Sequence, residues 1–310
     1  MTAPPLVVPF TKMTGAGNDF LVLDNRFMRF TDVELEAMAA RWCPRRTAVG
    51  ADGLLALDEP DAKGAHFRMR YRNADGSLAT MCGNGARCLA RFAARAGLGD
   101  ADGDGTRHLT FDTDGGRYTA TVPDPDSASG PVTLAMPPPR AFGRTEVSVG
   151  ERPVWEIWTG TEHAVVFSDD AAGEDLDALA PPVRHAPAFP HGANVNLVQL
   201  LSSQTTSPLP EGEGQGEGSP TARLRVRTFE KGVEGETLAC GTGAVAAALA
   251  ARLAGRTDAD RVAVEMPGGT LTVGFAIGPA DGDDPAAAVS ALTLAGPADA
   301  VYDGTLEWRG

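Results

Sequence analysis

The sequence predicts an α+β fold made of two pseudo-symmetric halves. The chain has 310 residues, and at roughly 150 residues per domain this length predicts two domains. An internal repeat is the stronger evidence: MCGNGARCLARFAARAGL begins at Met81, and ACGTGAVAAALAARLAG begins at Ala239. Each copy opens with Cys-Gly-x-Gly and continues as an Ala-rich helix, then a strand, a Gly-Gly turn and another strand. This shared order indicates a duplicated supersecondary unit.

The N-terminal half contains further predicted elements in a regular order. The apolar run 20–23 in KMTGAGNDFLVLDNR predicts a strand. Thr31 and Glu34 have the spacing of a capping box, which predicts that a helix begins there. Strand-like runs follow at 53–57 and 66–71.

We expect the first half to comprise 1–129, with 298–310 returning to it, and the second half to comprise 130–297. The stretch 201–222 is rich in Ser, Thr, Pro, Gly and Glu and has few apolar side chains. Such a composition cannot bury enough surface to offset its ordering entropy, so it predicts a disordered insertion between two strands.

Composition excludes several classes of protein. The formal net charge is −14 and no basic block interrupts it, so neither nucleic acid nor an anionic membrane is an expected partner. No apolar run reaches the ~18 residues of a membrane span, and the N-terminus lacks the basic start of a secretory signal. Four cysteines are too few for a disulfide scaffold. We therefore expect a cytoplasmic protein with reduced thiols.

The repeated motif places Cys82 and Cys240 each at the start of a helix. Glycines after each cysteine allow a sharp turn and leave the first helical amides uncovered. Such amides form an anion site, and the positive helix end favours a thiolate. One such cysteine alone would be read as a packing residue; two in matching contexts favour chemistry.

Two facing units of this kind would suit a 1,1-proton transfer. One sulfur removes a proton from a carbon while the other supplies a proton to the opposite face, which inverts the configuration. An amino acid, with a carboxylate next to a C–H centre, fits the anion site. Helix ends contribute only up to ~2 kcal/mol, so fixed amides in a site closed against water must supply most of the stabilisation.

The sequence resembles the diaminopimelate epimerases, through motifs that appear in family order. These are KMTGAGNDF, RNADGSLATMCGNGARC, GTEHAV, ANVNLV, EKGVEGETLACGTGA and VYDG. The resemblance implies two domains, each with a mixed or antiparallel sheet wrapped around a central helix, and an active site in the interdomain cleft. It further implies a homodimer, no cofactor, no metal, and interconversion of LL- and meso-diaminopimelate for lysine and peptidoglycan precursor synthesis.

The resemblance also implies roles for individual residues. Cys82 and Cys240 match the acid/base pair, and His163 and Glu230 match residues around the reacting centre. Tyr302 matches a dimer contact. The positions that match substrate-binding residues are Asn18, Asn73, Gly83, Asn84, Thr161, Asn194, Lys231, Gly241 and Thr242.

Other roles remain open for several of these residues. Asn18 and Asn73 lie in Gly-rich turns, where asparagine often only caps the turn. His163 could be a satisfied core histidine, and Glu230 with Lys231 could form a solvated hairpin tip. The two remaining cysteines, Cys43 and Cys88, are expected to be packing residues.

Two departures from the family pattern concern substrate choice. Thr161 and Glu162 stand where the family usually has Asn-Pro, and Lys231 stands where it usually has Arg. Lys is a point charge, whereas Arg can hold a carboxylate through two parallel bonds. A racemase of the same fold with another amino-acid substrate therefore stays a competing interpretation, and a thiol metal or redox protein is a remote one. The sequence does not say which cysteine acts on which stereoisomer.

Overall fold

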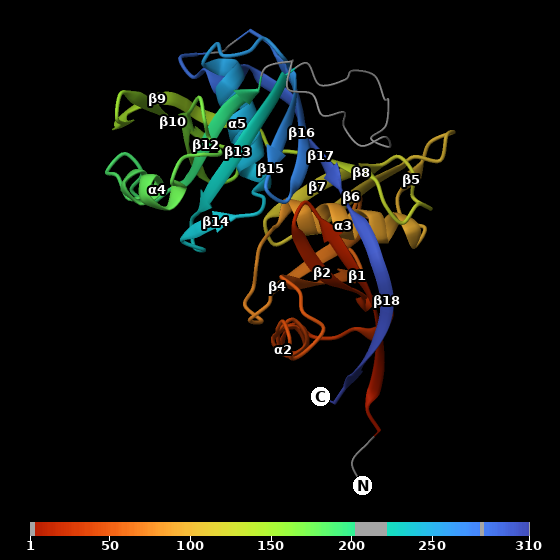
Figure 1. Cartoon of the computed structure of the whole chain (residues 1–310). Coiled ribbons are helices and arrows are strands. Elements are labelled where there is room, and N and C mark those ends of the chain that lie inside the picture. The colour runs from red at the N-terminus through yellow and green to blue at the C-terminus, as the bar shows by residue number, and fades with distance from the viewer. Residues whose placement is uncertain (1–3, 202–221, 280–281, 310) are drawn as a thin grey trace. The chain divides into compact units, whose positions relative to one another are not determined.

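The computed structural model describes residues 4–201, 222–279 and 282–309 and divides the chain into two compact units. Unit 1 is Met1–Leu134 with Gly296–Gly310, and unit 2 is Ala135–Ala295. Figure 1 labels the elements of both units. Of the insertion predicted at 201–222, residues 202–221 lie outside the described ranges.

Unit 1 contains strands around one long helix, with shorter helices outside. Its elements are β1 (Leu6–Gly15), β2 (Asn18–Asp24), α1 (Asn25–Met28), α2 (Asp32–Trp42), β3 (Gly53–Asp58), β4 (Phe67–Asn73), α3 (Gly83–Arg95), β5 (Asp100–Ala101), β6 (Arg107–Thr113), β7 (Gly116–Val122), β8 (Pro131–Ala135) and β18 (Asp299–Trp308).

Unit 2 repeats this arrangement. Its elements are β9 (Arg140–Val149), β10 (Arg152–Trp158), β11 (Glu162–Phe167), α4 (Leu176–Arg184), β12 (Asn194–Leu201), β13 (Ala222–Glu230), β14 (Gly235–Thr237), α5 (Gly241–Leu253), β15 (Arg261–Met266), β16 (Gly269–Ile277), the 3₁₀ helix η1 (Pro285–Ala288) and β17 (Val289–Pro297). Strands β8 and β17 each run across a unit boundary.

The strand pairings show the duplication directly. In unit 1, neighbours follow the order β18-β1-β2-β3-β4-β6-β7-β8, and only the β2–β3 and β4–β6 pairs of this order are parallel. In unit 2 the order is β9-β10-β11-β12-β13-β15-β16-β17, with β11–β12 and β13–β15 parallel. In both series the parallel pairs occupy the same places, and a helix connects the two strands of each. The predicted pseudo-symmetric α+β fold is confirmed.

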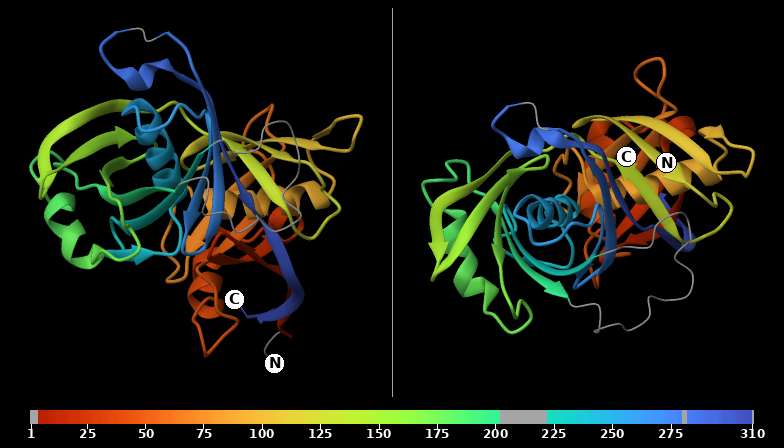
Figure 2. Two further views of the ribbon diagram at one scale, coloured as in Figure 1. Left: turned by 45° about the horizontal axis from the view of Figure 1, so that its top comes forward. Right: turned by 90° about the horizontal axis from the view of Figure 1, so that it is seen from above.

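The two longest helices form the centres of the units. Helix α3 packs against β1–β4, β6 and β7, and α5 packs against β10–β13, β15 and β16. The right view of Figure 2 shows α5 end-on with strands of unit 2 around it. Both helices are rich in alanine and almost wholly buried, and small side chains allow the surrounding strands to approach closely. The predicted sheet around a central helix is present in each unit.

Local sequence signals account for the outer helices. The Thr31 hydroxyl accepts from the Glu34 backbone N–H, and the Glu34 carboxylate accepts from the Thr31 backbone N–H, so the predicted capping box is confirmed. Inward-facing Leu35 and Met38 pack with Trp42 into the core between α2 and the sheet. Asp175 caps α4 in the corresponding place of unit 2. These caps fix where each outer helix begins.

The second glycine of each Cys-Gly-x-Gly motif meets different surroundings. A Cβ added at Gly243 would lie 2.5 Å from the Asn196 Oδ1 atom, whereas one at Gly85 would lie 3.3 Å from the Leu55 side chain. The first contact is too short for any side chain, while the second needs a small adjustment.

We expect Gly243→Ala to destabilise the protein by roughly 1–3 kcal/mol, because the new methyl group overpacks a polar site. The matched Gly85→Ala should change the free energy of unfolding by less than about 1 kcal/mol, since alanine's helix propensity offsets the tighter packing. Urea unfolding of both variants measures this difference, and equal losses would contradict it.

Candidate active site

The predicted site residues of unit 2 lie at one edge of its sheet. His163, near the start of β11, pairs with Asn194 at the start of the parallel strand β12. Strand β13 is antiparallel to β12 and ends at Glu230, so its last residue reaches the same edge. Helix α5 begins shortly afterwards with Cys240 as its N-cap.

Unit 1 has the same arrangement. Strand β2 begins at Asn18, Gly53 at the start of β3 pairs with Asn73 at the end of β4, and α3 follows with Cys82 as its N-cap. The duplication therefore brings each cysteine to the sheet edge at which its own unit's predicted binding residues lie.

Both cysteines occupy extended backbone just before a helix of 13 residues. Neither N-cap side chain makes a capping hydrogen bond, so the first amides of α3 and α5 depend on other groups. Cys82 is partly exposed and Cys240 is buried, with its sulfur 3.5 Å from the Thr242 hydroxyl. Gly83 and Asn84, like Gly241 and Thr242, form the first turns where an anion would bind.

His163 is held in one tautomer by its neighbours. The Asn196 amide nitrogen donates to the Ala164 carbonyl, which can only accept, and also contacts His163 Nδ1 at 3.1 Å. Nδ1 therefore accepts, and the proton of the neutral ring lies on Nε2. Thr228 completes the network by donating to Asn196 Oδ1 at 2.9 Å. His163 Nε2 has no hydrogen-bond partner among the described residues, so it is a donor available to a ligand.

Burial shifts the pKa values of two of these groups. It lowers the pKa of His163 from 6.5 to about 3, with the nearby Lys231 charge acting in the same direction. It raises the pKa of Glu230 above its ordinary value. Near neutral pH the histidine is therefore uncharged. Glu230 is half-buried, so it is not a fully solvated hairpin tip.

Thr161 and Lys231, the two departures from the family pattern, contact the same carboxylate. Lys231 Nζ lies 2.9 Å from Glu162 Oε2, and the Thr161 hydroxyl donates to that atom at 3.1 Å. The hydrogen bond from Lys231 lowers the pKa of Glu162. The Lys231 backbone N–H donates to Asn194 Oδ1 at 2.7 Å, which ties Asn194 to the same loop.

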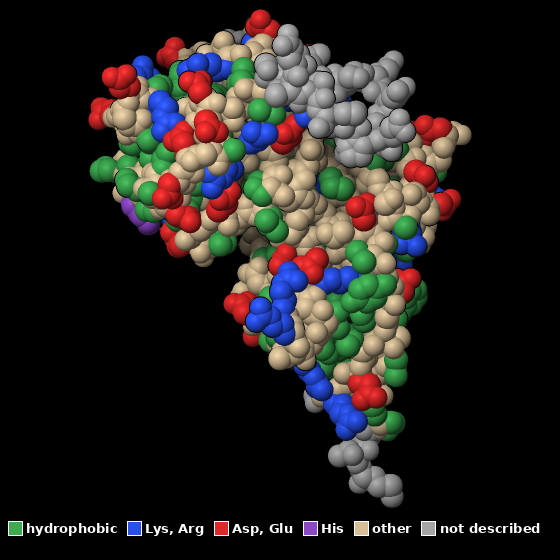
Figure 3. Space-filling model, viewed as in Figure 1, with side chains coloured by type: hydrophobic (Ala, Val, Ile, Leu, Met, Phe, Trp, Pro, Cys, Tyr) green, Lys and Arg blue, Asp and Glu red, His purple; other side chains and the backbone are tan. Residues whose placement is uncertain are grey.

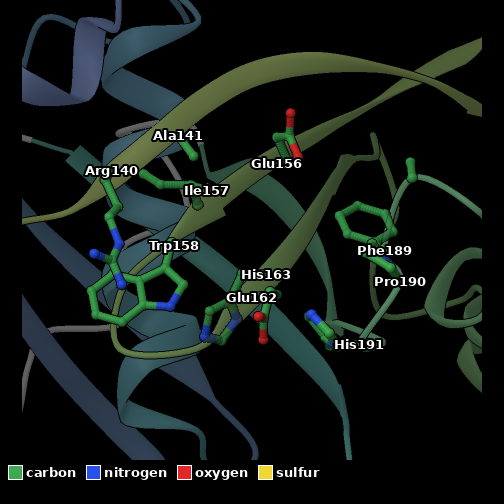
Figure 4. Close-up of a pocket in the computed structure, with 11 residues that line it drawn as sticks. Arg140, Ala141, Glu156, Ile157, Trp158, Glu162, His163, Phe189, Pro190 and His191 are labelled. Atoms are coloured by element: carbon green, nitrogen blue, oxygen red, sulfur yellow. The ribbon is translucent and has the colours of Figure 1, made fainter.

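A cavity of about 250 Å³ opens beside this ion pair and is lined by residues that include Glu156, Glu162, His163, Phe189 and His191. Figure 4 shows Glu162 and His163 side by side, with Arg140 against Trp158 at the far end. The guanidinium carbon of Arg140 lies 3.8 Å from the Trp158 ring centre.

In unit 1, the amide side chains predicted to bind substrate bond to one another. Asn84 Nδ2 donates to Asn18 Oδ1 at 2.7 Å, and Asn18 Nδ2 donates to Asp52 at 2.9 Å. Asn73 instead bonds to Ser77, through both its side chain and its backbone N–H. Asn73 thus closes a turn in this structure, while Asn18 and Asn84 join the start of β2 to the start of α3.

The remaining predicted residues lie apart from these edges. Cys43 and Cys88 are buried, and burial raises the pKa of each thiol to about 12. Tyr302 lies on β18 with 47% of its surface exposed, and its ring meets Phe10 edge-on at 5.9 Å. Its neighbour Val301 is also exposed, and Lys12 lies opposite Tyr302 on β1.

The surface, the metal-binding residue types and the helices give three further observations. On the face seen in Figure 3, acidic side chains are interspersed with basic ones. Ion pairs such as Arg45–Asp19 join acidic and basic side chains of the described residues. Within the described ranges, no three His, Cys, Asp or Glu side chains gather to hold a metal ion. No helix in those ranges is long and apolar enough to span a bilayer.

Comparison with solved structures defines the fold class. The structure matches a methylitaconate-delta-isomerase with a TM-score of 0.65 at 15% identity, covering 99% of this chain and 97% of that one. It matches a hydroxyproline epimerase from Agrobacterium vitis with a TM-score of 0.60 at 15% identity, covering 97% of this chain and 91% of that one. A PhzF-family protein from Bacillus anthracis gives a TM-score of 0.64 at 16% identity, covering 97% of this chain and 99% of that one. The chain therefore has the two-domain fold of these proteins.

Sequence comparison narrows this class to one family. The family model described as diaminopimelate epimerase matches residues 10–141 and 156–277. A diaminopimelate epimerase from Chlorobaculum tepidum is 38% identical, covering 95% of this chain and 99% of that protein. One from Thermosynechococcus vestitus is 37% identical, covering 96% and 98%. The chain belongs to the diaminopimelate epimerase family, a family of isomerases, and the resemblance seen in the motifs is confirmed.

Sequence reasoning missed several residues that hold the site together. Asn196 lies in the NVN motif that pointed to Asn194, and Glu162 lies in GTEH beside His163. Thr228 and Asp52 carry no motif signal. Thr228 becomes visible only when the strand register places it opposite Asn196, and Asp52 only when the fold brings it within hydrogen-bond distance of Asn18.

The depressed pKa of His163 predicts acid lability with a definite sign. The unfolded chain binds a proton near pH 6.5, whereas the folded protein does so only near pH 3. The contribution of neutral His163 to the free energy of unfolding is therefore fully present above pH 6.5. It decreases as the pH falls toward 3, by up to about 1.4 kcal/mol per pH unit.

We expect His163→Gln to unfold with a weaker dependence on pH between 6.5 and 4 than the wild type. Urea titrations at several pH values measure this slope. The exposed His191 provides a control, because no ion pair joins it to another described residue, and His191→Gln should therefore change the slope less than His163→Gln does. Identical slopes for wild type and His163→Gln would contradict the assignment.

Proposed function

We propose that this protein interconverts LL- and meso-diaminopimelate by proton transfer at the α-carbon between Cys82 and Cys240, without a cofactor. The observation that supports this most strongly is the duplicated unit, in which each cysteine caps a buried helix at the binding edge of its sheet. The relatives named diaminopimelate epimerase cover nearly the whole chain. The proposal requires both units to act on one substrate molecule.

The chemistry follows from what each unit presents. One thiolate takes the α-proton, and the other thiol gives a proton to the opposite face of the carbon; their roles exchange in the reverse direction. Backbone amides of Gly83 and Asn84, with those of Gly241 and Thr242, would hold the α-carboxylate, whose negative charge grows as the proton leaves. In this scheme neutral His163 donates through Nε2, and Glu230 orients the substrate at the same edge.

The distal end of the substrate would meet the residues in which this chain departs from the family. Lys231 offers a cation there, already paired with Glu162, and Thr161 and Asn194 offer polar groups. This pairing is also the observation that favours the second candidate, a racemase of the same fold with another amino-acid substrate. A thiol metal or redox protein stays the remote alternative.

We further propose a cytoplasmic homodimer in which Tyr302 on β18 contacts the copy. The exposure of Tyr302 and of its neighbour Val301 supports this contact, because exposed apolar side chains often mark an interface. The cytoplasm would keep both reacting thiols reduced.

Incubation with candidate amino acids in heavy water tests the reaction. We expect α-deuterium to enter LL- and meso-diaminopimelate, and Cys82→Ala or Cys240→Ala to lower the exchange rate by at least about 100-fold, as loss of an acid/base group does. Cys43→Ala is the control, because that thiol only packs in the core. Exchange with a monocarboxylic amino acid but not with diaminopimelate would favour the second candidate, and stoichiometric zinc would favour the remote one.

Steady-state kinetics of Glu162→Gln test the distal site. Loss of the ion pair should let Lys231 move, so KM for diaminopimelate should rise up to about fivefold, the scale of a half-exposed pair. The value of kcat should stay within about twofold. Glu156→Gln is the matched control, because Glu156 lines the same cavity but no ion pair joins it to Lys231.

A double variant decides whether Glu162 acts through Lys231. In a Lys231→Met background, Glu162→Gln should have no further effect on KM. Additive effects of the two substitutions would show that Glu162 acts on substrate independently, and an unchanged KM in both single variants would place the distal site elsewhere.

A further inference from the structure

Arg87 is a buried cation with no carboxylate partner. It lies on α3 with none of its surface exposed, and among the described residues no Asp or Glu forms an ion pair with it. Its Nη2 donates to Asn84 Oδ1 at 2.7 Å, its Nε reaches the Pro297 carbonyl at 3.4 Å, and its Nη1 has no partner in the described ranges. A buried charge is costly unless an anion or several hydrogen bonds compensate it.

The guanidinium lies over the first turn of α3. Long side chains on a helix lean toward its N-terminus, and the bond from Arg87 to Asn84, three residues earlier, shows this direction. The charge of Arg87 interacts with the thiols of Cys82 and Cys88. Burial raises the pKa of Cys88 to about 12, so Cys88 does not supply the missing anion; the other thiol within reach of the Arg87 charge is that of Cys82, the N-cap residue of the same helix.

A directed chain of hydrogen bonds leads away from Arg87. Arginine can only donate and a carboxylate can only accept. Asn84 must therefore turn its oxygen to Arg87 and its nitrogen to Asn18, and Asn18 must turn its nitrogen to Asp52. The two ends fix both amides in one orientation, so neither can flip without breaking a bond.

We propose that Arg87 is a positioning residue that supplies the fixed positive charge beside the Cys82 thiolate and orients the first turn of α3 through Asn84 and Asn18. Its catalytic use rests on the proposed function, but its effect on the Cys82 thiol does not. The cost of burying Arg87 is then offset when the thiolate forms or when a substrate carboxylate binds at α3.

Other charged groups near Arg87 do not take this role. Arg91, one turn further along α3, donates to backbone carbonyls of Asp124 and Ser127. Asp299 of β18 interacts with Cys88 and Arg91, and accepts from the Gly130 backbone N–H. At the far end, Asp52 is also held by Arg45.

The pH dependence of Cys82 alkylation by iodoacetamide, followed by peptide mass spectrometry in a Cys240→Ser protein, tests the charge. We expect Arg87→Met to raise the pKa of Cys82 by about one unit and to slow alkylation at pH 7 about tenfold. Arg87→Lys, which keeps the charge, should stay within about threefold of the parent. Arg91→Met is the matched buried-arginine control and should leave the profile unchanged.

An unchanged profile for folded Arg87→Met would overturn the proposal. If that variant does not fold, Arg87→Lys and Asp52→Asn decide instead. Both should raise KM for diaminopimelate several-fold, because they loosen the hydrogen bonds through Asn84 and Asn18. The value of kcat and the Cys82 alkylation profile should stay close to those of the parent, because both variants keep a positive charge at residue 87. Unchanged KM in both would overturn the positioning role.

The two proposals fail in different ways. If the protein exchanges no α-proton of diaminopimelate but Arg87→Met shifts the pH profile of Cys82 alkylation, the proposed function is contradicted and the role of Arg87 is supported. If the protein exchanges the α-proton of diaminopimelate but Arg87→Met leaves the alkylation profile of Cys82 unshifted, the proposed function is supported and the role of Arg87 is contradicted.

Discussion

The organisation of each unit depends on the uncapped N-terminus of its central helix. The first amides of any helix need acceptors, and in α3 and α5 the capping residue is a cysteine that makes no capping hydrogen bond. Alanine-rich sequence buries both helices inside a sheet, so bulk water reaches only the ends. An anion bound at the first turn would satisfy these amides, because the positive helix end favours negative charge. The surrounding strands serve to hold such an end in place.

The two units hold the N-terminus of the central helix in place with different side chains. Unit 1 fixes the start of α3 by the polar chain from Arg87 to Asp52. Unit 2 holds the α5 start close to Asn196 and Thr228, which leave no room for a side chain at residue 243. One thiol thus lies near a buried cation and the other near neutral polar groups. Such a difference suits a reaction in which one sulfur is a thiolate while the other carries a proton.

The fold could be predicted from the sequence because its signals are local and repeated. Cys-Gly-x-Gly, the alanine run and the Gly-Gly turn each specify backbone geometry within a few residues, and their recurrence reveals the duplication. The contacts that hold the candidate site could not be predicted in this way. Arg87 reads as an ordinary helical arginine, and Asp52 reads as a loop acid. Arg87 and Asp52 are 35 residues apart in the sequence. Only the tertiary structure shows that Asn84 and Asn18 connect them through hydrogen bonds.

Strand β11 carries a residue of the proposed chemistry, His163, next to a residue of the proposed distal site, Glu162. Successive side chains of a strand point to opposite faces. Glu162 therefore faces the side on which Trp158 and Lys231 lie, while His163 faces Asn196 and the central helix. The charges of Lys231 and Glu162 both act on the pKa of His163, so a change at either residue alters the surroundings of the imidazole, while the Asn196 contacts that set its tautomer stay in place. Under the proposed function, Thr161, Glu162 and Lys231 would bear on substrate choice, and the Asn196 network would keep His163 in the tautomer that the reaction uses.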